Sequence, residues 1–136
     1  MNSQTPVRMI PAPLVNPEAQ PFFQAAAESR LLYMRCEACG QPHHPPRSVC
    51  PHCHSDRTGW QTAAGLGTVY SASMLRKGVV VPYCVAYVTL DEGVTIMSDL
   101  VDFGDETPPV GTRVQVRFVE ADGGARVPMF GPVEAT

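Results

Sequence analysis

The second half of the chain alternates hydrophobic and polar residues over several short windows. In one of them, this period of two places Cys84, Ala86, Val88 and Leu90 on a single face, as in a half-buried β-strand. The other windows are also rich in β-branched and aromatic residues, and Gly, Pro or Asp separates them. The windows are residues 68–75, 83–90, 94–101, 113–120 and 126–130. Five short strands within about seventy residues predict a small barrel.

Turn-forming residues support this fold class. The run Asp91-Glu92-Gly93 separates the second and third windows, and residues 122–124 (Asp-Gly-Gly) separate the fourth and fifth. The chain also contains 14 prolines and 11 glycines among its 136 residues, which disfavours long helices. We therefore expect a mainly β protein.

One short helix is expected in the first half. In residues 21–30, Phe22 stands four positions before Ala26, and three consecutive alanines favour a helix. Asn16 or Gln20 is expected to cap it, with a proline near the first helical position.

These patterns divide the chain into three regions, with a boundary near Trp60 to Gly65. Residues 1–16 contain three prolines and no clear periodicity, so we expect an extended arm that is disordered or lies on a partner. Residues 17–62 are expected to hold the helix and a cysteine-rich ribbon. Residues 63–136 are expected to form the barrel.

The charge distribution narrows the possible functions. Ten Lys and Arg residues stand against 13 Asp and Glu residues, for a net charge of −3. Residues 1–60 have five cations and four acids (+1), whereas residues 61–136 have five cations and nine acids (−4). An acidic barrel disfavours nucleic-acid binding. No apolar run reaches the length of about 18 residues that a membrane helix needs, and no signal peptide is recognisable, so we expect a soluble cytoplasmic protein.

Four of the five cysteines form a metal-binding pattern. Two Cys-x-x-Cys pairs, Cys36 with Cys39 and Cys50 with Cys53, are separated by ten residues. Each pair aims two thiolates at one ion, and two pairs complete a tetrahedron, so we expect one structural zinc. Four thiolates close the coordination sphere, which excludes hydrolytic chemistry at the metal. Iron would accept the same ligands, and two disulfides would require an oxidising compartment.

Other residues near these cysteines have less specific patterns. Gly40 follows the first pair, where a positive φ is often required, and His54 occupies the equivalent place after the second pair. The histidines of the ribbon are candidates for replacement ligands or proton shuttles, but exposed ribbon histidines are ordinary; they are His43, His44, His52 and His54. Cys84 has no basic neighbour in sequence, so a buried core position is favoured over a nucleophile.

Two further groups of side chains are candidates for binding. Cations near the ribbon and the first barrel loop form a candidate site for the phosphates of a nucleotide-like ligand, with solvated surface positions as the alternative; they are Arg35, Arg47, Arg76 and Lys77. Aromatic residues outside the barrel pack the helix on the ribbon or form an exposed anchor for a partner; they are Phe22, Phe23, Tyr33 and Trp60. Four common catalytic signatures are absent from the sequence, and we assign no catalytic residue.

The order of the motifs resembles a known family. A Pro-Phe-Phe helix is followed by RLLYMRCEACG, PPRSVCPHCHS, GLGTVYSASM, PYCVAYVTLDEG and VGTRVQVRF. This order resembles rubredoxin-like zinc-ribbon plus OB-fold proteins associated with acyl-CoA enzymes, long carried as a domain of unknown function. The resemblance covers about residues 18–132, and His54 departs from the glycine frequent at its position in the family.

The resemblance implies a fold and a function. It implies a short N-terminal helix, a zinc ribbon ligated by the four cysteines, and a five-stranded OB barrel. It also implies a non-catalytic accessory subunit of a thiolase-like enzyme, or of an aldolase or hydratase, acting on acyl-CoA thioesters. Arg47 lies in the family's PPR segment, where a phosphate contact and structural bonding within the ribbon are the two alternatives for its role. With acyl-CoA as the implied ligand, the four candidate cations are the expected CoA contacts. Two alternatives stay open: a free-standing OB module for nucleic acid or another ligand, and an enzyme acting on CoA esters by itself.

Overall fold

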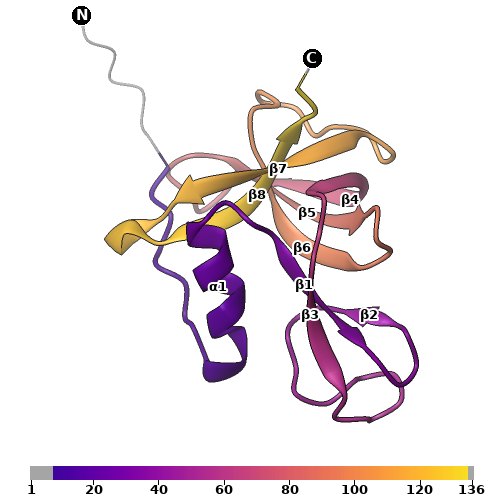
Figure 1. Ribbon diagram of the computed structural model, residues 1–136. Helices are drawn as coiled ribbons and strands as arrows, with labels where there is room; N and C mark the ends of the chain where they lie inside the picture. Colours follow the sequence, from indigo (N-terminus) through magenta and orange to yellow (C-terminus); the bar gives the residue numbers. More distant parts are fainter. Residues whose placement is uncertain (1–7, 135–136) are drawn as a thin grey trace, which may run out of the picture.

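The computed structural model describes residues 8–134 and consists of a short helix, a three-stranded ribbon sheet and a five-stranded barrel (Figure 1). The first elements are η1 (Pro17–Ala19), α1 (Gln20–Ala27), β1 (Leu32–Cys36), β2 (Pro42–His43) and β3 (Thr58–Thr62). The barrel strands are β4 (Leu66–Leu75), β5 (Tyr83–Leu90), β6 (Thr95–Leu100), β7 (Arg113–Glu120) and β8 (Arg126–Pro132), with a short 3-10 turn, η2 (Asp122–Gly124), between the last two. Among these elements, no helix is both long and apolar enough to cross a bilayer.

The barrel closes in the strand order β4-β5-β6-β8-β7. Neighbours pair antiparallel, except that β6 and β8 run parallel where Leu100 faces Phe130. Alternate residues of β5 are buried, as the period of two predicts: Cys84, Ala86, Val88 and Leu90. All five predicted strands and the closed barrel are therefore confirmed. Gly67 in β4 is required by close packing, because a Cβ there would lie 2.8 Å from Val88 Cγ1 and from the Thr89 carbonyl oxygen.

The ribbon sheet has the order β2-β1-β3, with both pairs antiparallel. We did not predict these strands, because the segments that form them are short and rich in turn formers. β1 reaches Cys36 at its end, and β3 leads through Ala63 into β4. The sheet thus connects the cysteine cluster directly to the barrel.

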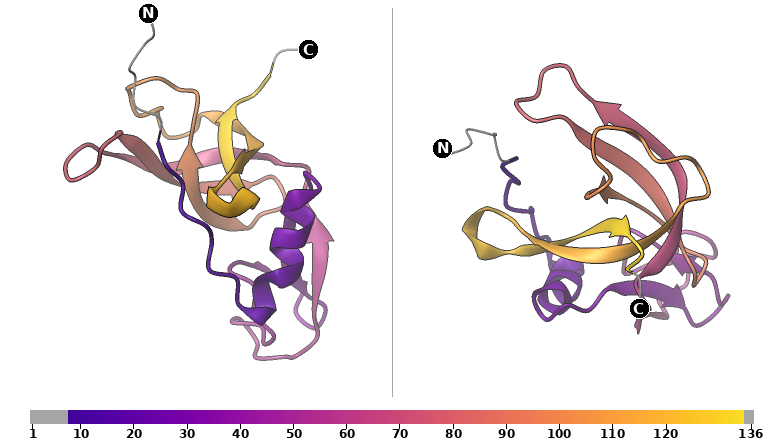
Figure 2. Two further views of the ribbon diagram at one scale, coloured as in Figure 1. Left: turned by 90° about the vertical axis from the view of Figure 1, so that its left-hand side faces the viewer. Right: turned by 90° about the horizontal axis from the view of Figure 1, so that it is seen from above.

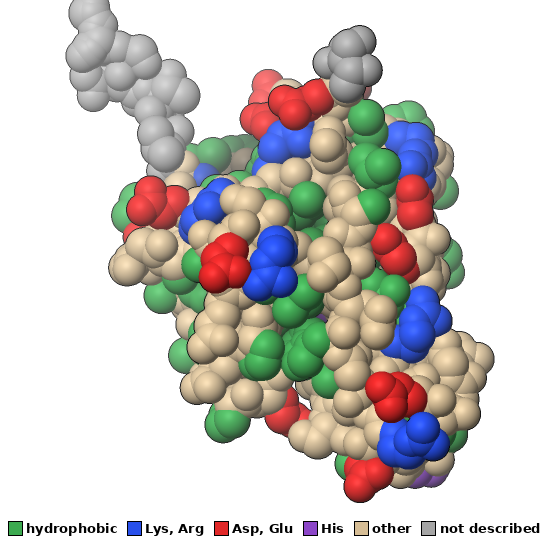
Figure 3. Space-filling view, viewed as in Figure 1, with side chains coloured by type: hydrophobic (Ala, Val, Ile, Leu, Met, Phe, Trp, Pro, Cys, Tyr) green, Lys and Arg blue, Asp and Glu red, His purple; other side chains and the backbone are tan. Residues whose placement is uncertain are grey.

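One hydrophobic core joins the helix, the ribbon sheet and the barrel. Phe22 and Ala25 of α1 belong to the same buried cluster as Leu32 and Tyr33 of β1 and Phe130 of β8. In Figure 3, hydrophobic side chains are also visible at the surface between α1 and the ribbon, while acidic and basic side chains alternate around them. The barrel and the ribbon therefore share packing instead of standing as two separate cores.

The predicted helix is confirmed, as α1. Asn16 precedes η1, and its side-chain Oδ1 accepts a hydrogen bond of 2.9 Å from the Ala19 amide. Pro17 occupies the first position of η1. The C-terminal end of α1 is held to the barrel, because Arg126 Nη1 donates a hydrogen bond of 3.2 Å to the Ala27 carbonyl.

The N-terminal arm lies on the barrel of its own chain from Arg8 onward (Figure 2, left). Arg8 forms an ion pair with Asp99 of β6 and stacks on the Tyr83 ring, 3.7 Å from its centroid. Farther along, the Ile10 carbonyl accepts a hydrogen bond from the Asp122 amide. Residues 8–16 contain no helix or strand and contact the barrel of their own chain at Arg8 and Ile10, while contact of the arm with a partner stays a prediction; residues 1–7 lie outside the described part.

Candidate metal centre

The four cysteines of the two Cys-x-x-Cys pairs converge on one point. Cys36 ends β1 and Cys39 lies in the turn that follows it, while Cys50 and Cys53 lie in a second turn, between β2 and β3. All four sulfurs lie within 4.8 Å of one another. The Sγ–Sγ distance is 3.6 Å between Cys36 and Cys53 and 3.8 Å between Cys39 and Cys50.

These separations fit a tetrahedral zinc ion. With Zn–S bonds of about 2.3 Å, a regular tetrahedron has S–S edges of about 3.8 Å. A disulfide would require S–S contacts of about 2.05 Å, so the sulfurs are not placed as bonded pairs. Cys36 and Cys50 are buried, whereas Cys39 and Cys53 are exposed. The ion would therefore sit at the surface of the ribbon with all four of its positions taken by thiolates.

The two turns have the same backbone hydrogen bonds. The Gly40 amide donates to the Cys36 carbonyl at 2.8 Å, and the His54 amide donates to the Cys50 carbonyl at 2.9 Å. Both residues have positive φ angles, 79° at Gly40 and 68° at His54. The predicted equivalence of these two positions is confirmed, and the histidine adopts a conformation that favours glycine.

Backbone amides stabilise the anionic form of the sulfurs. The Cys39 amide lies 3.5 Å from Cys36 Sγ, and the His52 amide lies 3.3 Å from Cys50 Sγ. The hydrogen bond from the Cys39 amide is the main cause that lowers the pKa of Cys36 to about 6, although burial opposes it. A thiol with this pKa is a thiolate at neutral pH, which is the form that binds metal.

Three of the four ribbon histidines are buried or make contacts within the ribbon and with α1. Burial lowers the pKa of His44 to about 4, and its ring packs against Phe22 with centroids 5.4 Å apart. His43 is only 4% exposed, and burial lowers its pKa as well. His52 Nε2 lies 3.2 Å from the Pro42 carbonyl oxygen, which links the second cysteine turn to β2. None of these histidines belongs to the metal-ligand cluster found among residues 8–134.

The four candidate CoA-binding cations do not form one cluster. Arg35 lies in β1 and donates a hydrogen bond of 2.6 Å to the Gly40 carbonyl, and Arg47 follows in the ribbon loop. Arg76 and Lys77 lie in the β4–β5 loop, at the opposite end of β5 from the turn that approaches Pro42 of β2. Since β5 has eight residues, about 25 Å of strand separates the two pairs. A single phosphate group cannot contact both pairs.

Cys84 and most of the aromatic candidates belong to the core. Cys84 is 5% exposed and faces the barrel interior, where burial raises the pKa of its thiol. This environment confirms the core interpretation over a nucleophile. Phe22 and Tyr33 are buried, while Phe23 and Trp60 are partly buried against the same core.

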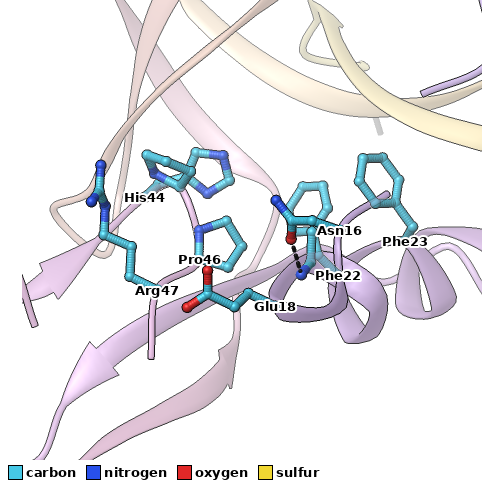
Figure 4. A pocket seen from close by; sticks show the side chains of 9 residues that line it. Asn16, Glu18, Phe22, Phe23, His44, Pro46 and Arg47 are labelled. Carbon is cyan, nitrogen blue, oxygen red and sulfur yellow. Dashed lines mark hydrogen bonds between the residues drawn. The ribbon is translucent and has the colours of Figure 1, made fainter. Parts of the chain in front are cut away.

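A hollow of about 360 Å³ lies between α1 and the loop that contains Arg47 (Figure 4). Phe22, Phe23 and His44 line it, and the side chains of Glu18 and Arg47 stand at its rim. Arg47 also lines a second hollow, on the side of β3. Of the four predicted cations, Arg47 is thus the one that lines these two hollows.

One contact at this hollow has no signal in the local sequence pattern. Glu18 Oε2 accepts hydrogen bonds of 2.6 Å from both the amide and the hydroxyl of Ser48. The side-chain hydrogen bond from Ser48 is the main cause that lowers the pKa of Glu18. Because the two residues are 30 positions apart, only the tertiary fold brings them together.

Comparisons with known proteins agree with both regions. Residues 23–59 match the family described as the ChsH2 rubredoxin-like zinc ribbon domain, and residues 60–119 match the ChsH2 C-terminal OB-fold domain. The ribbon match, together with the cysteine geometry, confirms one structural zinc as the metal.

Curated relatives and a solved structure extend these matches. The chain is 36% identical over 135 residues to a probable enoyl-CoA hydratase alpha subunit of Thermomonospora curvata, which covers 95% of this chain and 42% of that protein. It is 30% identical over 110 residues to a DUF35 domain-containing scaffold protein of Methanocaldococcus jannaschii, covering 74% and 77%. A solved structure, Ltp2-ChsH2(DUF35) aldolase, superposes with a TM-score of 0.77 and 35% identity, covering 89% of this chain and 98% of that one. The chain thus spans less than half of the hydratase subunit.

Proposed function

Because the chain belongs to the ChsH2 family, which combines a rubredoxin-like zinc ribbon with a C-terminal OB fold, we propose that it is a non-catalytic accessory subunit of an acyl-CoA enzyme. The partner would be a thiolase-like enzyme, or an aldolase or hydratase, that acts on acyl-CoA thioesters. The observation that carries this proposal is the match, over nearly the whole solved chain, to a ChsH2 protein of an aldolase that also contains Ltp2.

The names of the curated relatives support the same proposal. One relative is called a scaffold protein, and another is called a probable enoyl-CoA hydratase alpha subunit. The first name fits a protein that assembles other subunits. The second places a similar chain within an acyl-CoA enzyme.

The chemistry of the described residues favours scaffolding over catalysis. Four thiolates fill the zinc coordination sphere, so no position is open for water or substrate. Two barrel carboxylates are engaged with arginines: Asp91 accepts two hydrogen bonds from Arg113, and Asp99 pairs with Arg8. The chain therefore supplies a shaped surface, and the reacting groups would come from the partner. A reducing compartment keeps cysteine thiols free of disulfides and available to zinc, and on that ground we infer a cytoplasmic location.

Arg47 is the residue that we assign to a CoA phosphate. It is exposed and lines two hollows beside α1. In contrast, Arg35 is hydrogen-bonded to the Gly40 carbonyl, and Arg76 is hydrogen-bonded to the Asp105 carbonyl. Lys77 shares the distant β4–β5 loop with Arg76. Arg47→Glu should weaken binding of an acyl-CoA to the complex about tenfold, and Lys77→Glu serves as the matched control.

The proposal is tested by co-expressing the tagged chain with thiolase-like, aldolase and hydratase subunits of its host. The expected result is a stoichiometric complex with one of them, with one zinc per copy of this chain. Acyl-CoA turnover should require the partner and should be absent from the isolated chain. Turnover by the isolated chain would overturn the accessory role, and so would failure of all three enzyme classes to associate.

A second candidate function is an OB module for single-stranded nucleic acid. The outer face of β4 and β5 favours it, because Tyr70 is 67% exposed and Tyr87 is 47% exposed there, and aromatic side chains can stack on bases. The net acidity of residues 61–136 opposes it, since that region has nine acids and five cations. Salt-dependent binding of a fluorescent oligonucleotide that Tyr87→Ala abolishes would support this alternative.

A further inference from the structure

Strand β3 forms a free edge of the ribbon sheet. The sheet order is β2-β1-β3, so β3 pairs with β1 on one side and has no strand on the other among residues 8–134. Figure 2 (left) shows β3 at the outer border of the molecule, beside α1. An edge strand offers unpaired backbone groups to another polypeptide.

The register identifies which backbone groups point outward. The Ala63 amide donates to the Leu31 carbonyl, and the Glu37 amide donates to the Arg57 carbonyl. In an antiparallel pair these bonded positions alternate, so Gly59 and Gln61 also face β1. The amides and carbonyls of the intervening residues therefore point to the free edge; these residues are Thr58, Trp60 and Thr62.

The free edge of β3 lacks the features that usually block strand addition. Its sequence, Thr-Gly-Trp-Gln-Thr, contains no proline, no lysine and no other charged residue. The opposite edge of the same sheet, β2, is only two residues long and begins with Pro42. Edge strands that must stay unpaired are usually short, charged or interrupted by proline. Only the β3 edge of this sheet is open to pairing.

A hollow of about 330 Å³ lies along this edge. Trp60 and Met34 form its floor on the sheet side, and Pro17 and Pro21 form its wall on the helix side. Arg47 and Asp56 are among its polar lining residues. The hollow, which we call the β3 groove, is thus bounded by α1, the ribbon loop and the outward-facing strand.

We propose that the β3 groove binds an extended segment of the partner enzyme subunit, which adds to β3 as a fourth strand. This inference rests on the proposed accessory function and names the surface that carries it out. The segment would exchange main-chain hydrogen bonds with Thr58, Trp60 and Thr62. Because directly opposed residues of paired strands share a face, the residue opposite Trp60 would point into the groove.

The groove also selects the chemistry of that segment. Its apolar lining consists of an indole, a thioether and two proline rings, and the indole is that of Trp60, so the residue opposite Trp60 should be apolar. Glu18 is already hydrogen-bonded to Ser48, and Arg47 is assigned above to a CoA phosphate, which leaves Asp56 to meet a polar residue of the segment at the rim. The backbone pairing itself needs no particular sequence, and specificity would come from the apolar position.

Backbone amide hydrogen exchange tests the pairing directly. The probe is the complex of the full chain with the enzyme subunit that associates in the co-expression experiment. In the free chain, the amides of Trp60 and Thr62 should exchange rapidly, while those of Gly59 and Gln61 are protected by β1. In the complex, exchange at Trp60 and Thr62 should slow at least about tenfold. Unchanged exchange at both residues in a formed complex would overturn the inference and leave the accessory function standing.

Two variants of one residue provide an independent test. Thr62→Pro removes an outward amide and places a ring at the free edge, but it removes no hydrogen bond to β1. Thr62→Val keeps the amide and has a similar size. Affinity for the partner subunit should fall at least about tenfold with Thr62→Pro and change less than about threefold with Thr62→Val. Zinc content and melting temperature of each variant verify folding, and the exchange measurement on the unmodified chain does not depend on either variant.

The remaining outcomes are also decisive. Wild-type affinity of a folded Thr62→Pro variant would overturn the inference. If the isolated chain dimerises in a concentration-dependent way and Thr62→Pro abolishes the dimer, the edge pairs with a second copy and not with the partner. If no enzyme subunit associates at all, the accessory function itself fails, and the inference fails with it.

Discussion

The carboxylate of Glu18 and the backbone of Ser48 meet at 2.6 Å, and this contact fastens the start of the helical segment to the ribbon loop. The Ser48 hydroxyl adds a second hydrogen bond of the same length. The contact sets the distance between η1 and the loop that carries Arg47. It therefore holds one wall of the β3 groove in place.

Replacing Glu18 should loosen this junction. Glu18→Ala removes both hydrogen bonds, so we expect a melting temperature lower by a few degrees and faster amide exchange at Ser48. Glu28→Ala is the matched control, since Glu28 is also exposed and bonds only to Arg30, two residues away. Equal melting temperatures for the two variants would show that the contact does not stabilise the fold.

The contact between Glu18 and Ser48 should also make the stability of the fold depend on pH. Hydrogen bonds from Ser48 hold the pKa of Glu18 below its ordinary value of 4.5 in the folded state. The stabilisation is therefore present above that value and is lost as the pH falls through the lowered pKa. A carboxyl titration followed by NMR should show Glu18 deprotonating at a lower pH in the folded chain than in unfolded peptide, and Ser48→Ala should reduce the difference.

His44 should make the chain less stable as the medium becomes acidic. Burial lowers its folded pKa to about 4, below the ordinary value of 6.5, so the unfolded chain binds a proton first as the pH falls. Stability is therefore lost from pH 6.5 downward. His44→Phe cannot be protonated and keeps an aromatic ring against Phe22.

Denaturant unfolding at pH 7.5 and pH 5 measures this effect. From pH 7.5 to pH 5, the unfolding free energy of the original chain should fall by about 2 kcal/mol more than that of His44→Phe. Acid effects on the zinc thiolates are common to both proteins and cancel in the comparison. An equal loss in both proteins would contradict the burial of a neutral imidazole at this position.

Substitutions at Gly40 and His54, the equivalent positions after the two cysteine pairs, should change the stability of the fold in opposite directions. At Gly40 a Cβ would meet no atom within 4 Å, so Gly40→Ala should cost only the backbone strain of a positive φ, about 1 kcal/mol. His54→Gly relieves that strain and should increase the unfolding free energy by about 0.5 kcal/mol. Thermal unfolding of the zinc-loaded variants measures both changes, and destabilisation by His54→Gly would show that the imidazole makes a compensating contact.

Loss of one zinc ligand should unfold the ribbon. Zinc binding and folding are coupled in small zinc domains, with about 10 to 16 kcal/mol of binding free energy. Cys39→Ala should therefore lose both zinc and the partner subunit. Cys84→Ala is the control, because Cys84 lies inside the barrel and outside the metal cluster, and it should retain one zinc per chain. Retention of zinc and partner by Cys39→Ala would refute the four-cysteine site.

Local sequence patterns were sufficient to predict the metal ligands and the barrel strands. The Cys-x-x-Cys spacing predicts which thiolates converge, because a two-residue turn leaves few ways to place both sulfurs. The alternation in β5 predicts its buried face, because a strand turns each successive side chain to the opposite side. Asn16 was identified as a cap for the same kind of reason, since its contact lies only three residues away.

The ribbon strands and the position of the arm were not predictable in this way. β1 and β3 are five residues each, and their alignment depends on contacts between residues more than 20 positions apart. Arg8 reaches Asp99 across most of the chain. Such contacts leave no periodic signal in either segment.

The sequence by itself therefore determined the zinc ligands, the five barrel strands and the single helix, because each depends on residues a few positions apart. Only the tertiary structure decided that the four predicted cations lie at two ends of the molecule, that Glu18 meets Ser48, and that the outward amides of β3 open into a groove. These features depend on the register between distant segments, which packing of the whole chain selects.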